Sequence, residues 1–533
     1  MARILAYDIG TTGVKTCLYE VGKAIQLVCS ASEGYDLYTL PGGGAEQHAD
    51  EWWEGMCKST ATLLKETGID PASIDGITFC SQMQGLVLVD EDGKPVRHPM
   101  SYMDQRASEE MKAGIGQGVK IAGMNVNKLV KSLLVTGAVS GSVKDPVWRY
   151  LWVKNHEPEK FRKVRWWLDV KEYIIGRMTG KFIMTEDSAW STFLYDTRKK
   201  TRGWSSEICD LFDIDIKHLP PVIKTTDVAG KLREAQAAEL GLAPGTPVYG
   251  GGGDASLIGI GAGCVRAGET HIYCGTSGWV STLVKRQIVD TDSMIAASVG
   301  AAPGLYNYFA EMETAGKSLE WVKDHLAKDE IGVYMNKEEI TGSKEKVYTS
   351  LYDYMSEVID SCPTGAGGVI FTPWLHGNRC PFEDHNSRGM FFNISLDTGK
   401  TEMLRAVTEG VCYHLRWMLE CEDKKIKTSK KIRFVGGGAL SAVTCQILAD
   451  ITGRTIETVD NPQNVGAAGA ALTAAVGMGV VRSLNEVRAL IPASAVYRPH
   501  SRDSKVYDRN YEVFKNLHRS NKKNFEKLND GLL

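Results

Sequence analysis

Two aspartates lie beside glycine-rich segments and are the first candidates for chemistry. Asp8 stands at the end of an apolar strand and is followed by a Gly-Thr-Thr-Gly turn, Gly10 to Gly13. The two glycines permit a tight or left-handed backbone, so amides can converge on an anion, and the two threonines add hydroxyl donors. Such a turn suits a phosphate, and Asp8 could orient a hydrated Mg2+ beside it. An ordinary hairpin carrying a surface aspartate fits the same residues equally well.

The second aspartate, Asp254, follows four consecutive glycines, Gly250 to Gly253. So flexible a run is entropically costly in regular structure, and it needs a reason such as close approach by a ligand or another backbone segment. Asp254 could serve as a general base. A carboxylate after glycine also suits the N-cap of a helix, and residue type alone favours the cap.

Two further glycine-rich turns follow in the second half of the chain. IYCGTSGWV, residues 272–280, repeats the logic of the first turn with two hydroxyls and no charge. Gly436, Gly437 and Gly438 lie between a strand and an amphipathic helix, as in a nucleotide-binding turn. Neither segment is GxGxxG or GxxxxGK[ST], which argues against a dinucleotide-binding Rossmann site and a P-loop. Each unit alone is weak evidence, whereas the four in this order favour phosphate chemistry.

The elements that must position these turns alternate between strands and helices, which predicts an α/β fold. With 533 residues the chain is too long for one ordinary core, and two domains are expected, with the boundary in the Pro- and Gly-rich segment 241–263. A hairpin is expected with its turn at Asp92-Gly93. Periodicity predicts helices over 49–68, 145–164, 312–326 and 401–420, and strands near 4–8, 269–284 and 430–436.

Composition excludes several classes of function. A formal charge of -3 gives no bulk attraction to nucleic acid or to an anionic membrane. The N-terminus has no signal-peptide pattern and no apolar run approaches the roughly 20 residues that cross a bilayer, so a cytoplasmic protein is expected. The 12 cysteines show no CxxC pair, which argues against a zinc site and a disulfide framework. Residues 502–531 are charged and predict a solvated terminal helix.

Taken together, the motifs resemble the FGGY carbohydrate kinases, in the fold group of actin, hexokinase and the Hsp70 chaperones. The resemblance covers nearly the whole chain. Its motifs are DIGTTGVK, GGGAEQ at 42–47 followed by Trp52 and Trp53, SQMQG at 81–85, GGGGD, GTSG, GGGALS and the long segment from His376 to Arg416.

The resemblance implies two ribonuclease-H-like (actin/hexokinase-type) α/β domains flanking a deep cleft, with the sugar inside and ATP held mainly by the second domain. The expected division is 1–246, 247–490 and a helical tail, 491–533. ATP and Mg2+ are the implied cofactors, a sugar or polyol is the implied partner, and a homodimer is compatible with the family.

The resemblance also implies a role for each residue of the motifs. The implied roles are Asp254 as catalytic base and sugar contact; Asp8 as a catalytic residue facing the metal; Gly10, Thr11, Thr12, Gly13 and Lys15 at the transferred phosphate; Gly275, Thr276 and Ser277 at a second phosphate turn; Gly316, Gly437, Gly438 and Ala439 at the adenosine; and Gln82, Met83, Gln84, Asp104 and Arg106 at the sugar.

Within the family, SQMQG, YMDQR and the segment 177–196 are most similar to the xylulokinases, which implies phosphorylation of D-xylulose. Gln84 stands where those enzymes usually have histidine, and glutamine can exchange hydrogen bonds but supplies no cation. Met103 stands near where a tryptophan is commoner. Ribulose, glycerol and gluconate therefore remain alternative substrates. An actin- or Hsp70-like ATPase that acts on a protein partner is the alternative of a different class.

Overall fold

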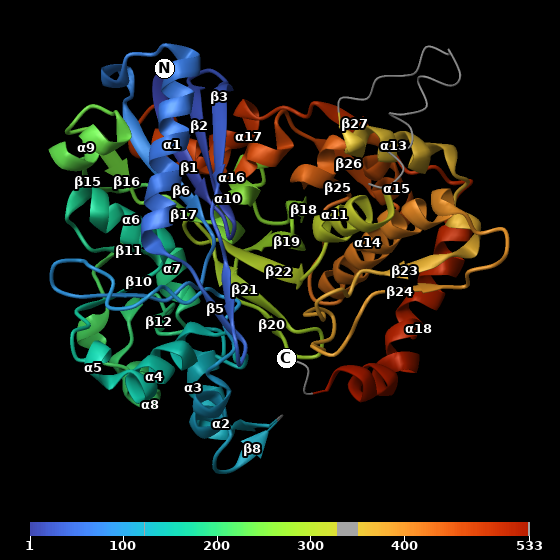
Figure 1. The fold of residues 1–533 in the computed structure, drawn as a ribbon, viewed down its shortest axis with the longest axis horizontal. Coiled ribbons are helices and arrows are strands. Elements are labelled where there is room, and N and C mark those ends of the chain that lie inside the picture. The colour runs from blue at the N-terminus through green and yellow to red at the C-terminus, as the bar shows by residue number, and fades with distance from the viewer. Residues whose placement is uncertain (122, 328–349, 531–533) are drawn as a thin grey trace.

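The computed structural model describes residues 1–121, 123–327 and 350–530. Its N-terminal elements are built around a mixed sheet with the order β15-β16-β6-β1-β2-β3, in which β17 also pairs with β6 (Figure 1). β1 pairs antiparallel with β2 and parallel with β6, and it is buried on both faces because helices cover the sheet. The strands are β1 Ala2–Ile9, β2 Gly13–Val21, β3 Ile25–Gly34, β6 Gly76–Ser81, β15 Val228–Lys231, β16 Pro247–Tyr249 and β17 Gly252–Gly253.

The C-terminal elements repeat this plan around a second sheet with the order β20-β21-β22-β19-β18-β25-β26-β27. β18 pairs antiparallel with β19 and parallel with β25, as β1 does with β2 and β6. The expectation of two similarly built halves is therefore correct. The strands are β18 Thr270–Cys274, β19 Gly278–Val284, β20 Val289–Asp290, β21 Ile295–Val299, β22 Tyr306–Met312, β25 Lys431–Val435, β26 Thr455–Thr458 and β27 Ala495–Tyr497.

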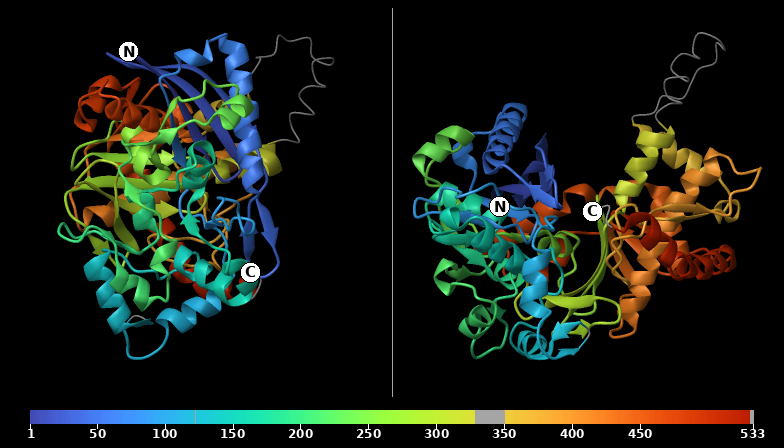
Figure 2. Two further views of the ribbon diagram at one scale, coloured as in Figure 1. Left: turned by 90° about the vertical axis from the view of Figure 1, so that its left-hand side faces the viewer. Right: turned by 60° about the horizontal axis from the view of Figure 1, so that its bottom comes forward.

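Helices cover both sheets, and short strand pairs shape the connections. In the right view of Figure 2 the blue-to-green residues gather on one side and most yellow-to-red residues on the other. The helices are α1 Ala49–Thr67, α2 Ser108–Ile115, α3 Val126–Val135, α4 Pro146–His156, α5 Pro158–Phe161, α6 Val170–Thr179, α7 Glu186–Ser191, α8 Ser206–Leu211, α9 Glu234–Leu240, α10 Asp254–Gly261, α11 Gly316–Val322, α13 Leu351–Ser361, α14 Lys400–Asp423, α15 Ala442–Thr452, α16 Val465–Gly477, α17 Val487–Leu490 and α18 Ser504–Asn529. The short pairs are β4 Tyr38–Leu40 with β5 Gly44–Glu46, β7 Val87–Val89 with β10 Trp166–Leu168, β8 Lys120–Ile121 with β9 Met124–Asn125, β11 Met184–Thr185 with β14 Val222–Ile223, β12 Tyr195–Asp196 with β13 Gly203–Trp204, and β23 Ile370–Thr372 with β24 Met390–Phe392.

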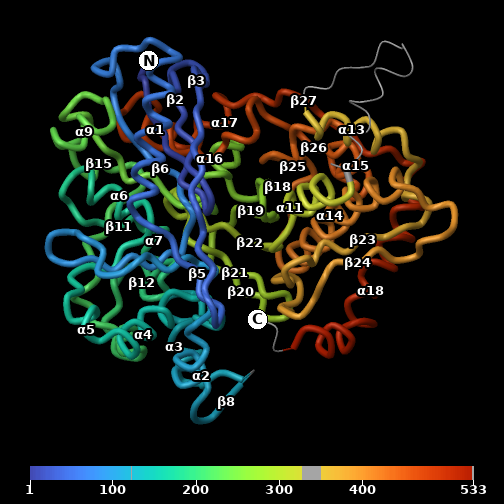
Figure 3. The backbone as a smooth tube through the Cα atoms, viewed as in Figure 1, coloured from blue at the N-terminus to red at the C-terminus, as the bar shows by residue number. Residues whose placement is uncertain are grey.

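One helix of the C-terminal half completes the N-terminal half. α16 is rich in Ala and Gly and buried on nearly all sides, so it packs against α10 and the strands β1 and β6. Its small residues permit close approach, since a Cβ at Gly469 would lie 2.1 Å from the Leu257 carbonyl oxygen. The tube in Figure 3 shows this orange-red segment beside the blue strands. The two halves therefore share a core, which fixes the ends of β1 and β6 relative to α10.

Three expected helices differ from those observed. The predicted helix 145–164 is two helices, because Pro158 disfavours a helical conformation at Glu157. The predicted helix 312–326 begins only at Gly316, since Met312 ends β22, and residues 323–327 form a π-helix. The terminal helix exists as α18 but is solvated on one face only: Tyr507, Tyr511 and Phe514 enter the second core.

Other expectations hold. The predicted turn near Asp92-Gly93 is present, with Gly93 at a φ of 79°. All 12 cysteines are free thiols, as their spacing predicts. Among the described residues, the helices that are long enough to cross a bilayer lack the apolar character to do so.

Candidate active site

The turn after β1 is a tight hairpin, in which the Gly10 amide donates to the Gly13 carbonyl at 2.9 Å. A Cβ at Gly13 would lie 2.8 Å from the Glu33 carbonyl oxygen, so the close neighbour strand requires glycine there. Tyr35 donates its hydroxyl to the Gly10 carbonyl at 2.6 Å, and Thr12 is exposed at the tip. The turn is a hairpin, as the simpler interpretation predicts, but its aspartate is half-buried rather than fully exposed.

Asp8 lies inside β1, one residue before its end, and is half-buried. Burial raises its pKa, and Lys15, directly opposite on β2, lowers it. The Lys15 ammonium donates a hydrogen bond to the Gln463 carbonyl at 2.7 Å rather than to Asp8, so it compensates the charge of Asp8 only in part. A Cβ at Gly466 would lie 2.8 Å from Asp8 Oδ2, so α16 begins directly against this carboxylate.

Asp254 is the first residue of α10, and Gly253 occupies the N-cap position. The expectation that Asp254 is the cap is therefore wrong by one residue, and its Oδ1 accepts from the Ala255 amide at 2.7 Å instead. The glycine run is explained by close approach. A Cβ at Gly251 would lie 2.2 Å from the Phe79 carbonyl oxygen, and one at Gly253 would lie 2.1 Å from Met83 Sδ.

The environment of Asp254 favours its neutral form. Burial is the largest cause that raises the pKa of Asp254, to about 7, and the negative charges of Asp8 and Glu311 add to the increase. The backbone amide of Ala255 opposes the shift. A carboxylate that releases its proton near neutrality is suited to proton transfer at physiological pH.

A pH profile follows from this pKa. Below about pH 7 the rate of any reaction that needs ionised Asp254 should fall roughly tenfold per pH unit, because the protonated acid accepts no proton, and above it the rate should level off. The measurement is kcat/KM for the substrate between about pH 5.5 and pH 9. A flat profile over this range would contradict the role of Asp254 as a base.

Sequence reasoning gave no role to Asp187, which supports this segment. It is fully buried, its Oδ2 accepts from the Gly253 amide at 2.8 Å, and its Oδ1 accepts from the Thr185 hydroxyl at 2.6 Å. Asp187 therefore holds the backbone immediately before Asp254. An aspartate one residue after the start of a short helix carries no local signal of such a long-range contact.

The turn between β18 and β19 also joins two antiparallel strands, but it is tighter than the first turn: the Gly275 amide donates to the Ser277 carbonyl, two residues on, at 3.0 Å. Gly316 donates its amide to the Gly275 carbonyl at 2.8 Å, and a Cβ at Gly316 would lie 2.4 Å from that oxygen. Gly316 thus lies against the second turn. Thr276 is exposed, and its carbonyl accepts from the amide of Ala315 at 3.1 Å.

The glycine loop after β25 lies beside the same strand end. A Cβ at Gly438 would lie 2.7 Å from Cys274 Sγ. Ala439 is buried, and its amide donates to the Gly436 carbonyl at 3.1 Å, whereas Gly437 is exposed. The structure therefore brings the 275–277 turn, Gly316 and the 437–439 loop together at the end of β18.

The residues expected at the sugar fall into two groups. Gln82 follows β6, and its backbone N–H donates to the Ile9 carbonyl at 2.8 Å, which places the residue beside the first turn. Met83 contacts Gly253, next to Asp254. Gln84 has a φ of 62°, and its backbone N–H donates to Asp169 Oδ2 at 2.8 Å. Gln82 thus lies beside the first turn, Met83 beside Gly253, and Gln84 beside Asp169 and the C-terminal end of α7.

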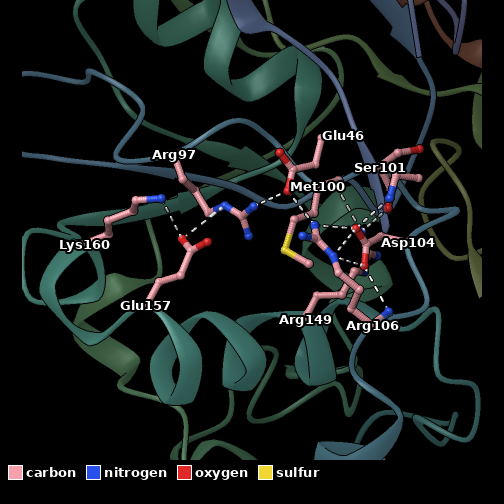
Figure 4. A network of polar contacts seen from close by, with 10 residues as sticks. Glu46, Arg97, Met100, Ser101, Asp104, Arg106, Arg149, Glu157 and Lys160 are labelled. Carbon is pink, nitrogen blue, oxygen red and sulfur yellow. Dashed lines mark hydrogen bonds and ion pairs between the residues drawn. The ribbon is translucent and has the colours of Figure 1, made fainter. Parts of the chain in front are cut away.

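Asp104 and Arg106 form the second group, and they bind each other (Figure 4). The buried Asp104 accepts from Arg106 at 2.6 Å and from the Ala45 amide at 2.8 Å, while Arg106 also pairs with Glu46 at 2.5 Å. Arg106 also lies over the ring of Trp152. These contacts occupy much of the hydrogen-bonding capacity of both side chains.

Arg149 is a second residue that sequence reasoning missed. It is fully buried in α4, and it donates to the carbonyls of Met100 at 3.1 Å, Ser101 at 2.6 Å and Lys144 at 2.9 Å, as well as to that of Gln84. Burial lowers its pKa to about 10. One cation thus joins three segments, including those that carry Asp104 and Gln84.

Both halves of the chain match models of one protein family. The model of the FGGY family of carbohydrate kinases, N-terminal domain, matches residues 3–261, and that of the C-terminal domain matches residues 271–478. The chain is 29% identical over 523 residues to the xylulose kinase of Bacillus subtilis, with 97% of each chain covered. It is 26% identical to the gluconokinase of Bacillus licheniformis, covering 97% of this chain and 96% of the relative.

A solved structure shows the same fold over the whole length. Ligand-bound xylulose kinase from Lactobacillus acidophilus superposes with a TM-score of 0.83 at 25% identity, covering 99% of this chain and 100% of that one. The two sheets with their covering helices are thus the two-domain actin/hexokinase-type fold. With both of its halves matched, the chain belongs to the FGGY family of carbohydrate kinases.

Proposed function

We propose that this kinase transfers the γ-phosphoryl group of ATP to a hydroxyl of D-xylulose, giving D-xylulose 5-phosphate. The observation that carries the proposal is the position of Asp254, which directly follows β17 at the sheet edge where β1 ends, because Gly253 and Ile9 both pair with Ser81. Burial, together with the negative charge of Asp8, raises the pKa of Asp254 to about 7. The full-length similarity to xylulose kinases supports the choice of sugar.

In this proposal Asp254 accepts the proton of the attacking hydroxyl. Phosphoryl transfer requires the acceptor oxygen in line with the γ-phosphorus, compensation of phosphate charge and a destination for the hydroxyl proton. Met83 packs against Gly253, and the carboxylate of Asp187 accepts from the backbone N–H of Gly253. The position of Asp254, the next residue, is therefore fixed from two sides. Gly10 to Gly13 and Lys15 would face the transferred phosphate.

Asp8 is the residue that would hold Mg2+. Its carboxylate is half-buried and only partly compensated by Lys15, and burial raises its pKa, so a cation beside it would relieve an unfavourable charge. Mg2+ would compensate the charge of the phosphates during transfer. We place the ATP phosphates at Gly275, Thr276 and Ser277, and the adenosine at Gly316, Gly437, Gly438 and Ala439.

Gln82, Met83 and Gln84 would contact the sugar, whereas Asp104 and Arg106 would shape the loop that faces it. Gln84 exchanges hydrogen bonds with hydroxyl or carbonyl groups without adding charge. Its backbone is anchored by Asp169, so its place at the site is fixed. Because gluconokinases are also similar over the full length, an aldonate is the second candidate substrate.

A substrate panel tests this choice. ADP release coupled to a reporter reaction is measured with D-xylulose, L-ribulose, glycerol and gluconate, each with and without a chelator of Mg2+. D-xylulose should give the largest kcat/KM, and chelation should abolish turnover. A larger kcat/KM for gluconate or glycerol would show that the sugar is wrong while the kinase activity stands.

A further inference from the structure

The side chain of Gln47 bridges two parts of the candidate site. It is 1% exposed and lies just after β5. Its Nε2 donates to the Thr11 carbonyl at 2.6 Å, and its Oε1 accepts from Gln82 Nε2 at 2.9 Å. One amide therefore connects the first phosphate turn with a residue of the proposed sugar site.

These contacts fix the orientation of both amides. A backbone carbonyl can only accept, so Gln47 must direct its NH2 group at Thr11 and its oxygen at Gln82. Gln82 must then direct its NH2 group at Gln47, which leaves the Gln82 oxygen pointing away from Gln47. The reverse orientation of Gln82 would place two amide oxygens against each other. The Thr11 carbonyl thus determines which atom of Gln82 is free to meet a ligand.

Backbone contacts hold Gln47 in this position. The backbone N–H of Gln47 donates to the Pro99 carbonyl at 3.0 Å. Ala45, two residues earlier, accepts from the Ser101 amide at 2.8 Å and donates to Asp104 at 2.8 Å. The segment cannot shift without breaking the loop that carries Asp104.

We propose that Gln47 is a positioning and specificity-determining residue, which presents the acceptor oxygen of Gln82 to a donor hydroxyl of the sugar and couples that contact to the phosphate turn at Thr11. The inference rests on the proposed function, because it assumes that Gln82 faces the sugar. A sugar bound there must offer a hydroxyl, rather than a carbonyl, to Gln82.

A double-mutant cycle tests the coupling. Gln47→Leu frees the Gln82 amide to rotate and leaves the Thr11 carbonyl unpaired, so kcat/KM for the sugar should fall by about 10- to 100-fold. KM for ATP should stay within about twofold. In a Gln82→Leu background the same change should alter kcat/KM for the sugar by less than about threefold, because its effect acts through Gln82. A merely structural role would give additive losses.

Two further variants keep the test decisive. Gln47→Glu is nearly the same shape, and it should reproduce the loss because its second oxygen opposes the Thr11 carbonyl; thermal unfolding confirms that it folds. Gln26→Leu, at an exposed position of β3, is the matched control and should behave as wild type. An unchanged kcat/KM for the sugar in both Gln47 variants, or additive effects in the cycle, would overturn this inference and leave the proposed function standing. Absence of sugar-dependent turnover in the wild type would overturn the proposed function and this inference together.

Discussion

Replacement of Asp254 by asparagine is expected to lower kcat for sugar phosphorylation by about 10²- to 10⁴-fold, the usual contribution of a positioned general base. The asparagine side chain keeps the shape of aspartate but accepts no proton from the hydroxyl. KM for ATP should change little, since the turns proposed for the nucleotide lie at the end of β18. Steady-state kinetics with saturating MgATP measure both quantities.

The same variant should be more stable than wild type at alkaline pH. In the folded chain Asp254 has a pKa of about 7, whereas an unfolded aspartate titrates near 3.9. Between about pH 4 and pH 7 the unfolded chain releases the Asp254 proton while the folded chain keeps it. The free energy of unfolding therefore decreases as the pH rises through this range. Asparagine avoids that loss, so its Tm should exceed that of wild type at about pH 8 but not at about pH 4.

The control for both measurements is Asp210→Asn, at an exposed position of α8, which should change neither kcat nor Tm appreciably. Turnover of Asp254→Asn at the wild-type rate would remove Asp254 from the role of base. Lost turnover together with a lower Tm at every pH would instead indicate damage to the fold.

Replacement of Arg149 by methionine is expected to destabilise the protein by about 3–5 kcal/mol, because several buried carbonyls lose a charged donor and methionine offers none. These carbonyls belong to segments that carry Asp104 and Gln84. In the fraction that folds, the sugar KM should rise by about 10- to 100-fold, since small displacements of positioning groups are costly.

Chemical denaturation and steady-state kinetics test this expectation. Arg162→Met is the matched control, since Arg162 is exposed and forms a surface ion pair with Glu159 on the same short stretch; it should change stability by less than about 0.5 kcal/mol. If Arg149→Met were as stable as this control, the buried guanidinium would not be what holds the three segments together.

The sequence predicts much of this arrangement because the turn chemistry is local. Gly10 to Gly13 and Gly275 to Ser277 each lie between two strands whose apolar pattern is readable, and both hairpins are observed. The α/β class and the repeated plan follow from the same local patterns. Helix ends are less predictable: Pro158 divides one expected helix, and Met312 joins β22 because pairing with β19 overrides its helical preference.

What could not be predicted depends on contacts between distant residues. Gly253 rather than Asp254 caps α10, because β17 pairs with β6 up to that point. Nothing near Asp187 in the sequence indicates that it binds the backbone of Gly253, and nothing near Arg149 indicates that it joins three segments of the chain. The pKa of Asp254 likewise arises from burial and from Asp8, which is 246 positions away in the chain.

The most direct test of the central claim is the dependence of ADP release on sugar in the wild-type protein. Initial rates are measured with MgATP alone and with D-xylulose added, and the phosphorylated product is identified by mass spectrometry. The proposed function predicts slow ADP release from MgATP alone, a large stimulation by the sugar, and one pentose phosphate formed per ADP. Equal ADP release with and without any sugar of the panel, and no phosphorylated product, would contradict the claim and favour an ATPase that acts on a protein partner.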